Sequence, residues 1–318
     1  MIMSDISTES GTAAGGIDQI RHIVIVGAGA MGSQIGMLCA LAGFDATITD
    51  LQGDALDRAE HELRQRLTRD IEKGRRTRDE VDVAFGRLEF STDLTTAATT
   101  ADYVIEAAVE KLDVKRQLFA DLDRLAPPPA ILATNSSSIV SSRIADATGR
   151  PDRVCNMHFF NPALVMKCVE VVRGPDTSDE TVQVTVELAR RLGKVPVVLN
   201  REIPGFIANR ILGAVRDEAI FLLENGIASV EDIDTACRTA LGYPMGPFEL
   251  MDLTGIDIGY LTKKDRFAAS GDPKDQPSRS VSALVERGEL GRKTGRGWYE
   301  YDEAGTKTPR PTEQVTSS

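Results

Sequence analysis

The chain changes its pattern of hydrophobic and polar positions near residue 201. Before that point, short apolar runs alternate with longer segments in which apolar residues recur every three or four positions. The apolar runs cover residues 23–26, 46–49, 87–90, 103–106, 131–134, 154–160, 167–172 and 195–199. Strands that alternate with helices are typical of a parallel sheet covered on both faces. We therefore predict an α/β, Rossmann-type doubly wound domain over residues 18–200.

Two departures from simple alternation are informative. Residues 54–73 and 77–85 carry consecutive helical patterns separated by Gly74, which predicts a helical hairpin inserted at about 54–85. Only residues 161–165 separate the runs 154–160 and 167–172. That gap is too short for the crossover that parallel strands need, so this pair should be antiparallel. The other helices are predicted at 31–42, 93–98, 111–125, 139–147 and 179–192.

Residues 201–301 show helical periodicity without strand alternation. Helices are predicted over 204–225 and 230–241, and weaker ones follow to about 287. The first carries an apolar stripe wide enough to pack against another helix, made of Phe206, Ile207, Ile211, Val215, Ala219 and Leu222. We predict an all-α C-terminal domain here. The polar residues 1–17 are expected to form a disordered tail and residues 302–318 a loose one.

The first apolar run leads into glycines with the spacing of a dinucleotide-binding loop. Gly27, Gly29 and Gly32 match G-x-G-x-x-G between a strand and a helix, where the glycines permit a tight turn and close approach of a pyrophosphate. Asp50 ends the next strand, where a carboxylate would bind the adenosine ribose, and residues 51–52 bring no arginine for a 2′-phosphate. The spacing predicts an NAD site; a strand–helix turn without a ligand is the alternative.

A histidine and a glutamate stand at matching positions of the predicted antiparallel pair. A reversal centred on Leu164 places His158 opposite Glu170, because both lie six positions from the centre. A lone carboxylate in an apolar strand is unfavourable unless it is paired. A His–Glu pair removes that penalty, and the carboxylate would fix the imidazole tautomer and raise its basicity. We interpret the pair as a catalytic dyad; a purely structural histidine is the alternative.

Hydroxyl groups follow the predicted strand 131–134 in the segment 134–138. Ligands of open α/β sheets bind beyond the carboxyl ends of the strands, so these serines should lie at the site. The simpler interpretation is that one of them caps the helix predicted at 139–147. Ser, His and Glu together could also indicate a hydrolase triad. The G-x-S-x-G elbow of such enzymes is missing from the sequence, which makes hydrolysis the weaker hypothesis.

Composition narrows the class of protein. With 42% hydrophobic and 27% charged residues, the chain is typical of a globular enzyme. No apolar run approaches the ~20 residues that cross a bilayer, and residues 1–16 lack a secretory pattern, so we expect a cytoplasmic protein without a membrane partner. The four cysteines show no zinc-site spacing, and no metal is predicted. The net charge of −11 argues against binding to nucleic acid.

One segment departs from the acidic balance. Seven basic residues lie between positions 64 and 78 on the predicted hairpin, against only Asp70 and Glu72. A solvated helical face explains many such runs. The alternative is a binding site for a polyanionic group such as the phosphates of coenzyme A.

A set of motifs resembles the L-3-hydroxyacyl-CoA dehydrogenase family, including its short-chain 3-hydroxybutyryl-CoA members. The matching stretches are GAGAMG (27–32), EAAVE (106–110), ATNSSS (133–138), MHFFNP (157–162), MKCVEV (166–171), PGFIANR (204–210), GYPMGPF (242–248) and GRKTG (291–295). The resemblance runs from about residue 20 to residue 301, and the combination is far more specific than any single motif.

The resemblance implies roles for individual residues. His158 would be the general base and Glu170 its orienting partner, while Ser137 and Asn209 would bind the oxygen at C3 of the substrate. The residues implied to contact NAD are Gly27, Gly29, Met31, Gly32, Asp50, Glu110, Lys115, Asn135, Ser137, Asn161 and Lys293. Those implied to contact CoA on the hairpin are Arg64, Arg69, Arg75 and Arg76. The helical domain is similar to the family's dimerisation domain, which implies a homodimer.

The function expected from this resemblance is the reversible, NAD-dependent oxidation of (S)-3-hydroxyacyl-CoA to 3-oxoacyl-CoA. Two alternatives stay open. A dehydrogenase of free hydroxy acids or sugar acids on the same fold would not need the basic hairpin. A non-catalytic relative would bind NAD without turnover. The sequence alone leaves the acyl chain length and the metabolic direction open.

Overall fold

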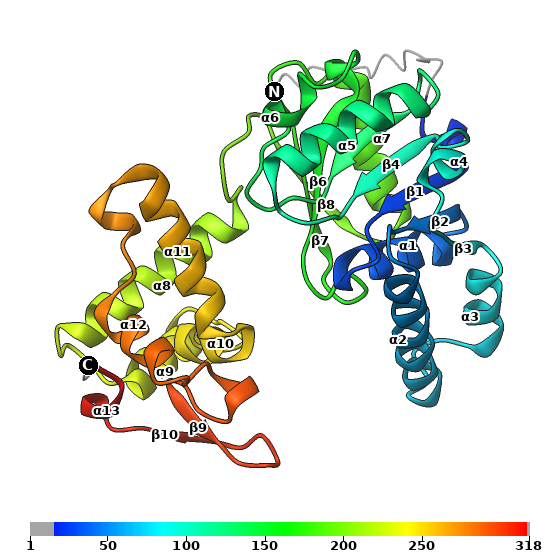
Figure 1. Cartoon of the computed structure of the whole chain (residues 1–318). Coiled ribbons are helices and arrows are strands. Elements are labelled where there is room, and N and C mark those ends of the chain that lie inside the picture. Colours follow the sequence, from blue (N-terminus) through cyan, green and yellow to red (C-terminus); the bar gives the residue numbers. More distant parts are fainter. Residues whose placement is uncertain (1–15, 317–318) are drawn as a thin grey trace, which may run out of the picture. The chain divides into compact units, whose positions relative to one another are not determined.

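Figure 1 shows the computed structural model of the chain, which describes residues 16–316. It divides into two compact units, residues 1–207 and 208–318. The predicted boundary at 200/201 lies a few residues earlier. The segment after the strand Val195–Leu199 (β8) stays with the first unit, because Glu202 accepts a hydrogen bond from the Ser142 N–H (3.1 Å) and Glu170 accepts one from the Ile207 N–H (3.0 Å). Of residues 1–17, for which disorder is predicted, 1–15 fall outside the described residues, while Ile17 is buried and begins a short 3₁₀ helix.

An eight-stranded sheet forms the centre of the first unit, in the order β3-β2-β1-β4-β5-β6-β7-β8. The strands are β1 His22–Val26, β2 Asp45–Thr49, β3 Leu88–Ser91, β4 Tyr103–Glu106, β5 Ile131–Thr134, β6 Val154–Phe159, β7 Cys168–Val172 and β8 Val195–Leu199. Neighbouring strands pair in parallel, except β6 and β7, which are antiparallel. The doubly wound fold and the antiparallel pair are both confirmed.

Helices cover both faces of this sheet, as Figure 1 shows. They are α1 Ala30–Leu41, α2 Gly53–Glu72, α3 Arg78–Phe85, α4 Leu94–Ala98, α5 Leu112–Leu125, α6 Ser142–Ala145 and α7 Asp179–Arg191. The alternation along β1 divides the core between the faces. Ile23 and Ile25 belong to one buried cluster, and Val24 and Val26 belong to another that includes Phe119 of α5. This is the period of two that a strand buried on both faces requires.

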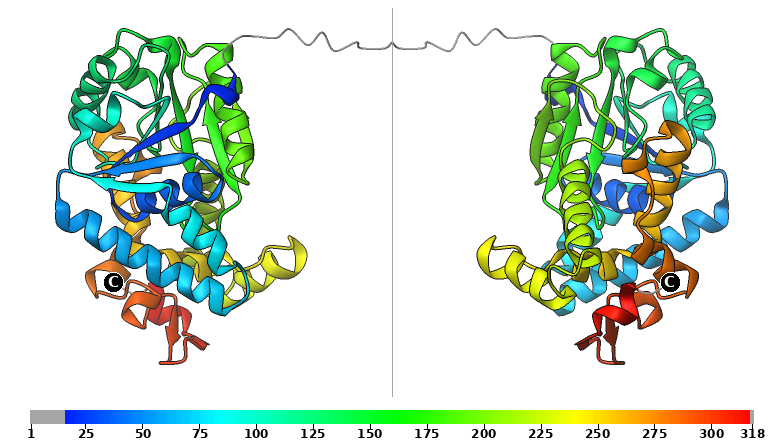
Figure 2. Two further views of the ribbon diagram at one scale, coloured as in Figure 1. Left: turned by 90° about the vertical axis from the view of Figure 1, so that its right-hand side faces the viewer. Right: turned by 90° about the vertical axis from the view of Figure 1, so that its left-hand side faces the viewer.

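The predicted hairpin is present as α2 and α3, the long blue helix and the shorter cyan helix of Figure 2. Both helices contact α1. Thr77 begins α3 with a capping box, in which its hydroxyl accepts the Glu80 N–H and the Glu80 carboxylate accepts the Thr77 N–H. The Arg64 guanidinium of α2 lies 4.1 Å from the centre of the Phe85 ring of α3, which helps to hold the two helices together.

Helix α6 is shorter than the predicted helix over 139–147. Side chains bind the backbone groups that a longer helix would use. Ser136 Oγ accepts the Ile139 N–H (2.8 Å), and Asn156 Oδ1 accepts the Ser141 N–H (2.7 Å). The turn after β5 is therefore held by buried side chains rather than by helical hydrogen bonds.

The second unit is mainly helical. Its helices are α8 Ala208–Glu224, α9 Val230–Ala240, α10 Pro247–Thr254, α11 Ile256–Ser270, α12 Arg279–Glu286 and α13 Thr312–Thr316. Helix α8 begins four residues later than predicted, because Gly205 and Phe206 have positive φ values of 79° and 49°. Within residues 16–316, no helix combines the length and the apolar character needed to cross a membrane.

The end of the chain differs from the predicted all-helical domain and loose tail. A hairpin of β9 Tyr299–Tyr301 and β10 Lys307–Pro309 precedes α13. Val315 is fully buried, and Arg310 donates to the Gly297 carbonyl. Strands of three residues are too short to give a recognisable alternation in the sequence, which is why the pattern did not reveal them.

Candidate active site

The centre of the candidate site is the pair formed by His158 of β6 and Glu170 of β7. The two residues are direct register partners, which confirms the reversal centred on Leu164. Nδ1 of His158 lies 2.9 Å from Oε2 of Glu170, and both side chains are buried. Because the carboxylate can only accept the hydrogen bond from Nδ1–H, the neutral imidazole carries its lone pair on Nε2.

Ser137 lies at the other end of the imidazole. It follows β5 and is exposed, and its Oγ is 3.0 Å from Nε2 of His158. The two aromatic neighbours of the imidazole are Phe160 and Phe206, with ring centres 4.6 Å and 5.2 Å from that of His158. The result is a chain of hydrogen bonds, Ser137–His158–Glu170, at the edge of the sheet where β5 and β6 end.

The two serines beside Ser137 are held by Glu110. Its carboxylate accepts hydrogen bonds from the Ser136 hydroxyl, the Ser138 hydroxyl (2.7 Å) and the Ser138 N–H (3.1 Å). Burial alone would raise the pKa of Glu110, but these hydrogen bonds and the charge of Lys115 outweigh it and lower the pKa. A carboxylate that stays ionised therefore fixes the loop carrying Ser137.

Behind Glu110 lies a buried ion pair that the sequence interpretation missed. Nζ of Lys115 is 2.6 Å from Glu106 and 3.3 Å from Glu110, and the Lys115 and Glu106 side chains are 1% and 0% exposed. The second oxygen of Glu106 accepts the Thr134 hydroxyl at 2.6 Å. Lys115, predicted as an NAD contact, thus faces two carboxylates. The signal for Glu106 was available, because an acid that ends an apolar strand is the same anomaly that identified Glu170.

The glycine loop fits a dinucleotide. Gly27 has φ 109°, and a Cβ there would lie 2.6 Å from the Ala107 carbonyl oxygen. A Cβ at Gly32 would lie 1.9 Å from the Gly27 carbonyl oxygen, so neither position has room for a side chain. Gly29, the N-cap of α1, faces open space and leaves the helix terminus without a side-chain cap. Backbone N–H groups at such a terminus bind phosphate. Asp50 Oδ2 accepts the Ala28 N–H at 2.9 Å, which holds the carboxylate beside the loop.

Three further predicted NAD contacts belong to this unit. Met31 is half-buried in the first turn of α1. Asn135 follows β5 and its Oδ1 accepts the Phe159 N–H at 2.9 Å, so this amide also ties β5 to β6. Asn161 is exposed and lies two residues after the end of β6. All three lie at the carboxyl ends of the strands, on the same edge as the glycine loop and Ser137.

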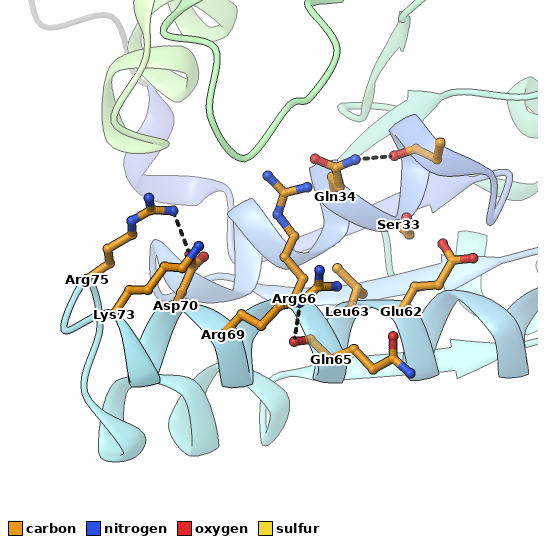
Figure 3. A pocket seen from close by; sticks show the side chains of 11 residues that line it. Ser33, Gln34, Glu62, Leu63, Gln65, Arg66, Arg69, Asp70, Lys73 and Arg75 are labelled. Atoms are coloured by element: carbon orange, nitrogen blue, oxygen red, sulfur yellow. Dashed lines mark hydrogen bonds and ion pairs between the residues drawn. The ribbon is translucent and has the colours of Figure 1, made fainter. Parts of the chain in front are cut away.

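The basic hairpin contributes to a cavity of about 370 Å³ between α1 and α2. Of the four arginines predicted to contact CoA, Arg69 and Arg75 line it. Arg64 and Arg76 are not among its lining residues. Arg64 instead packs on Phe85. Arg66 and Lys73 line it instead, and Figure 3 shows Arg66 extending from α2 towards α1. The lining holds four basic side chains against two acidic ones, Glu62 and Asp70, and so keeps an excess of positive charge. Asp70 forms an ion pair with Arg75 at 3.2 Å.

The remaining two predicted site residues belong to the second unit. Asn209 lies in the first turn of α8. Lys293 follows α12, and its ammonium lies 2.6 Å from each carboxylate oxygen of Asp257. Their predicted roles stay predictions.

Comparison with known proteins agrees with this arrangement. The family described as "3-hydroxyacyl-CoA dehydrogenase, NAD binding domain" matches residues 22–203, and its C-terminal domain matches residues 205–301. A probable 3-hydroxybutyryl-CoA dehydrogenase of Bacillus subtilis is 41% identical over 285 residues, which cover 90% of this chain and 99% of the relative.

Two solved structures are similar as well. The (S)-3-hydroxybutyryl-CoA dehydrogenase of Ralstonia eutropha has a TM-score of 0.82 and 37% identity, with 89% of this chain and 100% of that chain covered. A diketoreductase, described by its dual catalysis of dicarbonyl compounds, has a TM-score of 0.80 and 36% identity, with 89% and 99% covered. Since both domains match one family and the glycine loop fits its cofactor, the chain belongs to the 3-hydroxyacyl-CoA dehydrogenases and is an NAD-dependent oxidoreductase.

Proposed function

We propose that the protein oxidises (S)-3-hydroxyacyl-CoA with a short acyl chain, such as 3-hydroxybutyryl-CoA, reversibly to 3-oxoacyl-CoA. The observation that carries this proposal is the chain Ser137–His158–Glu170, which presents one imidazole nitrogen at the edge of the sheet that also carries the glycine loop. The short chain is supported by the names of the Bacillus and Ralstonia relatives.

In this proposal His158 is the general base. Its Nδ1–H donates to Glu170, so Nε2 carries the lone pair that takes the proton of the C3 hydroxyl. The Glu170 carboxylate stabilises the imidazolium that results. Bound NAD would supply the acceptor for the hydride that leaves C3. The Ser137 hydroxyl, 3.0 Å from Nε2, then has a second role as a donor to the C3 oxygen, together with the amide of Asn209.

The cofactor would be bound mainly by backbone groups. Gly27, Gly29 and Gly32 let the start of α1 approach the pyrophosphate, and Asp50 accepts the ribose hydroxyls. Glu110 and Lys115 act as one unit in this proposal, because the Lys115 ammonium lies between Glu110 and the buried Glu106. The other proposed contacts with NAD are Met31, Asn135, Asn161 and Lys293.

The CoA phosphates would bind the basic cavity between α1 and α2. Arg69 and Arg75 were predicted for this role, and the lining adds Lys73. An Arg69→Gln/Lys73→Gln variant should raise KM for acetoacetyl-CoA by about tenfold, because charged hydrogen bonds are lost. KM for acetoacetyl-pantetheine, which lacks the nucleotide phosphates, should stay unchanged. An equal rise for both thioesters would contradict this use of the cavity.

The activity itself is tested by following NADH absorbance with acetoacetyl-CoA and, separately, with free acetoacetate. We expect rapid loss of NADH with the thioester alone. Loss only with the free acid, or no loss although NADH binds, would leave the fold unchanged and overturn the proposed function. A series of 3-oxoacyl-CoA substrates of increasing length then tests the preference for a short chain.

A second candidate function is suggested by the similarity to the diketoreductase. A reductase of dicarbonyl compounds on the same fold could use His158 in the same way without CoA. The discriminating measurement is kcat/KM for a 1,3-dicarbonyl compound without CoA against that for acetoacetyl-CoA. The basic cavity favours the thioester.

The protein would act as a homodimer through its second unit. That unit exposes several large apolar side chains, including Ile211, Phe221, Ile258 and Leu261, each at least 50% exposed. Exposed apolar surface of this kind is typical of protein interfaces. Sedimentation equilibrium should give twice the chain mass of 34.4 kDa, and Phe221→Glu should shift the protein towards the monomer. A monomeric wild-type protein would contradict this assembly.

A further inference from the structure

Phe206 has an unusual backbone for its residue type. Among the described residues, it is the non-glycine residue with positive φ, at 49°. A bulky side chain is disfavoured in this region, and such a conformation persists only when the surroundings hold it. Residues held in this way cluster at functional sites. The residues that stabilise this conformation, and the groups that Phe206 contacts, are therefore of interest.

The Phe206 ring is held in a small core of its own. It is fully buried and clusters with Val140, Val172 and Leu199. Its ring centre is 5.2 Å from that of His158, while Phe160 lies 4.6 Å away in an edge-on arrangement. The imidazole of His158 is thus in contact with two aromatic rings.

The backbone of the same turn reaches the other member of the pair. Directly after Phe206, the Ile207 N–H donates to Oε1 of Glu170 at 3.0 Å, while Oε2 accepts Nδ1 of His158 at 2.9 Å. The two oxygens of one carboxylate therefore have different partners. The left-handed backbone at Phe206 brings both groups into place, the ring against His158 and the N–H against Glu170.

We propose that Phe206 and the Ile207 N–H form a clamp that positions the imidazole of His158. Rotation of the imidazole would carry Nε2 away from the line of proton transfer, and small misplacements at a reacting centre reduce turnover strongly. The clamp opposes that rotation at the ring and at the carboxylate. Phe206 is a positioning residue that acts through His158, and this inference rests on the proposed role of His158 as the base.

The clamp is tested by Phe206→Leu, which removes the ring and keeps an apolar side chain. We expect kcat for acetoacetyl-CoA reduction to fall by about 10- to 100-fold, while KM for both substrates stays within about twofold. Phe44→Leu is the matched control, because Phe44 is also buried in the first unit but lies at the turn between α1 and β2. That control should keep wild-type kcat.

A double-mutant cycle separates positioning from general destabilisation. In a His158→Gln background, measured at high enzyme concentration, Phe206→Leu should cause no further loss, because the group that it positions is gone. An equal loss in both backgrounds would identify Phe206 as a structural residue and overturn the clamp. Wild-type kcat in Phe206→Leu would overturn it as well.

A spectroscopic measurement tests the clamp without relying on activity, and a second substitution at Phe206 covers the case in which Phe206→Leu does not fold. The Nδ1 proton of His158, shared with Glu170, should give a low-field proton NMR signal that disappears in His158→Gln. Phe206→Met, which nearly conserves volume, should shift or broaden that signal, and Phe44→Leu should not. An unchanged signal in Phe206→Met contradicts the clamp. Failure of the proposed function would look different, since wild type would then not oxidise NADH with acetoacetyl-CoA; failure of the general-base role alone would leave His158→Gln with near-normal turnover.

Discussion

The two units bury carboxylates in different ways. In the first unit, Glu106 lies against the Lys115 ammonium and Glu170 lies against His158. In the second unit, Asp252 accepts the N–H groups of Trp298 and Tyr299 and the Tyr301 hydroxyl, at 2.9 to 3.0 Å. Asp234 likewise accepts the Phe248 and Glu249 N–H groups and the Tyr299 hydroxyl.

The partners determine what each carboxylate does. Burial raises the pKa of Asp252 to about 6 and raises that of Asp234, since neutral donors offset only part of the desolvation. These two aspartates connect backbone segments, the start of α10 and the turn before β9, and so hold the second unit together. Glu106 and Glu170 instead face ionisable side chains, Lys115 and His158. Burial alone therefore does not distinguish the two kinds of carboxylate; the ionisable or neutral nature of the partner does.

The largest effect should come from Glu106→Gln, which leaves the Lys115 ammonium without its closest buried counter-charge. Breaking a buried ion pair in this way should lower the free energy of unfolding of the first unit by roughly 3–5 kcal/mol. Calorimetry of the full chain measures it. Glu60→Gln is the control, because its ion pair with Arg64 is exposed and should contribute less than about 1 kcal/mol. Equal losses in the two variants would contradict the comparison.

Glu170→Gln should reduce turnover more than stability. The amide can turn its NH₂ group towards His158, which favours the tautomer with a hydrogen on Nε2 and removes the free lone pair. We expect kcat to fall by about 100-fold or more, with an unchanged dissociation constant for NADH. Steady-state kinetics and fluorescence titration with NADH give the two values. A variant with near-wild-type kcat would mean that the carboxylate does not fix the tautomer.

Asp252→Asn should have the opposite profile. The carboxylate now accepts hydrogen bonds from three donor groups, and the NH₂ group of asparagine would face one or more of these donors. The second unit should therefore lose roughly 1–3 kcal/mol of stability at pH 7. Trp298 is the single tryptophan of the chain, and its fluorescence during urea unfolding reports on this unit. We expect kcat to stay within about twofold of wild type. A large loss of kcat in the folded variant would contradict the division of roles.

The smallest effect is a pH dependence in the same unit. The folded-state pKa of Asp252 is raised from 3.8 to about 6, so the fold favours the protonated carboxyl group. Its contribution to stability is therefore present below about pH 4 and is lost as the pH rises through about 6. The free energy of unfolding of wild type should exceed that of Asp252→Asn by about 2 kcal/mol less at pH 7 than at pH 4.5, which follows from a pKa shift of this size. An advantage that grows with pH would contradict it.

The same contrast explains how much the sequence revealed. Glu170 could be predicted because it interrupts an apolar strand and a short reversal sets its register with His158. The glycine loop could be predicted because its residues are neighbours in the chain. Asp234 and Asp252 lie in helices, where an acidic residue indicates solvent, and their partners lie 14 and 46 residues further along. No periodicity connects such distant segments.

Backbone conformation was the second limit of the sequence interpretation. The apolar stripe from Phe206 to Leu222 predicted a continuous helix, but the positive φ of Phe206 separates that residue from α8 and places its ring in the core next to His158. A phenylalanine gives no sequence signal for a left-handed conformation, which depends on the surrounding residues. The shortening of helix α6 and the β9–β10 hairpin also depend on local contacts that leave no periodic pattern in the sequence.

The central claim is that His158 moves the proton while the glycine loop binds the cofactor. The most direct test is His158→Gln, measured for acetoacetyl-CoA reduction and, in parallel, for NADH binding. We predict that kcat falls by about 10²- to 10⁴-fold and that the dissociation constant of NADH stays within about twofold. Near-normal turnover in His158→Gln would contradict the claim.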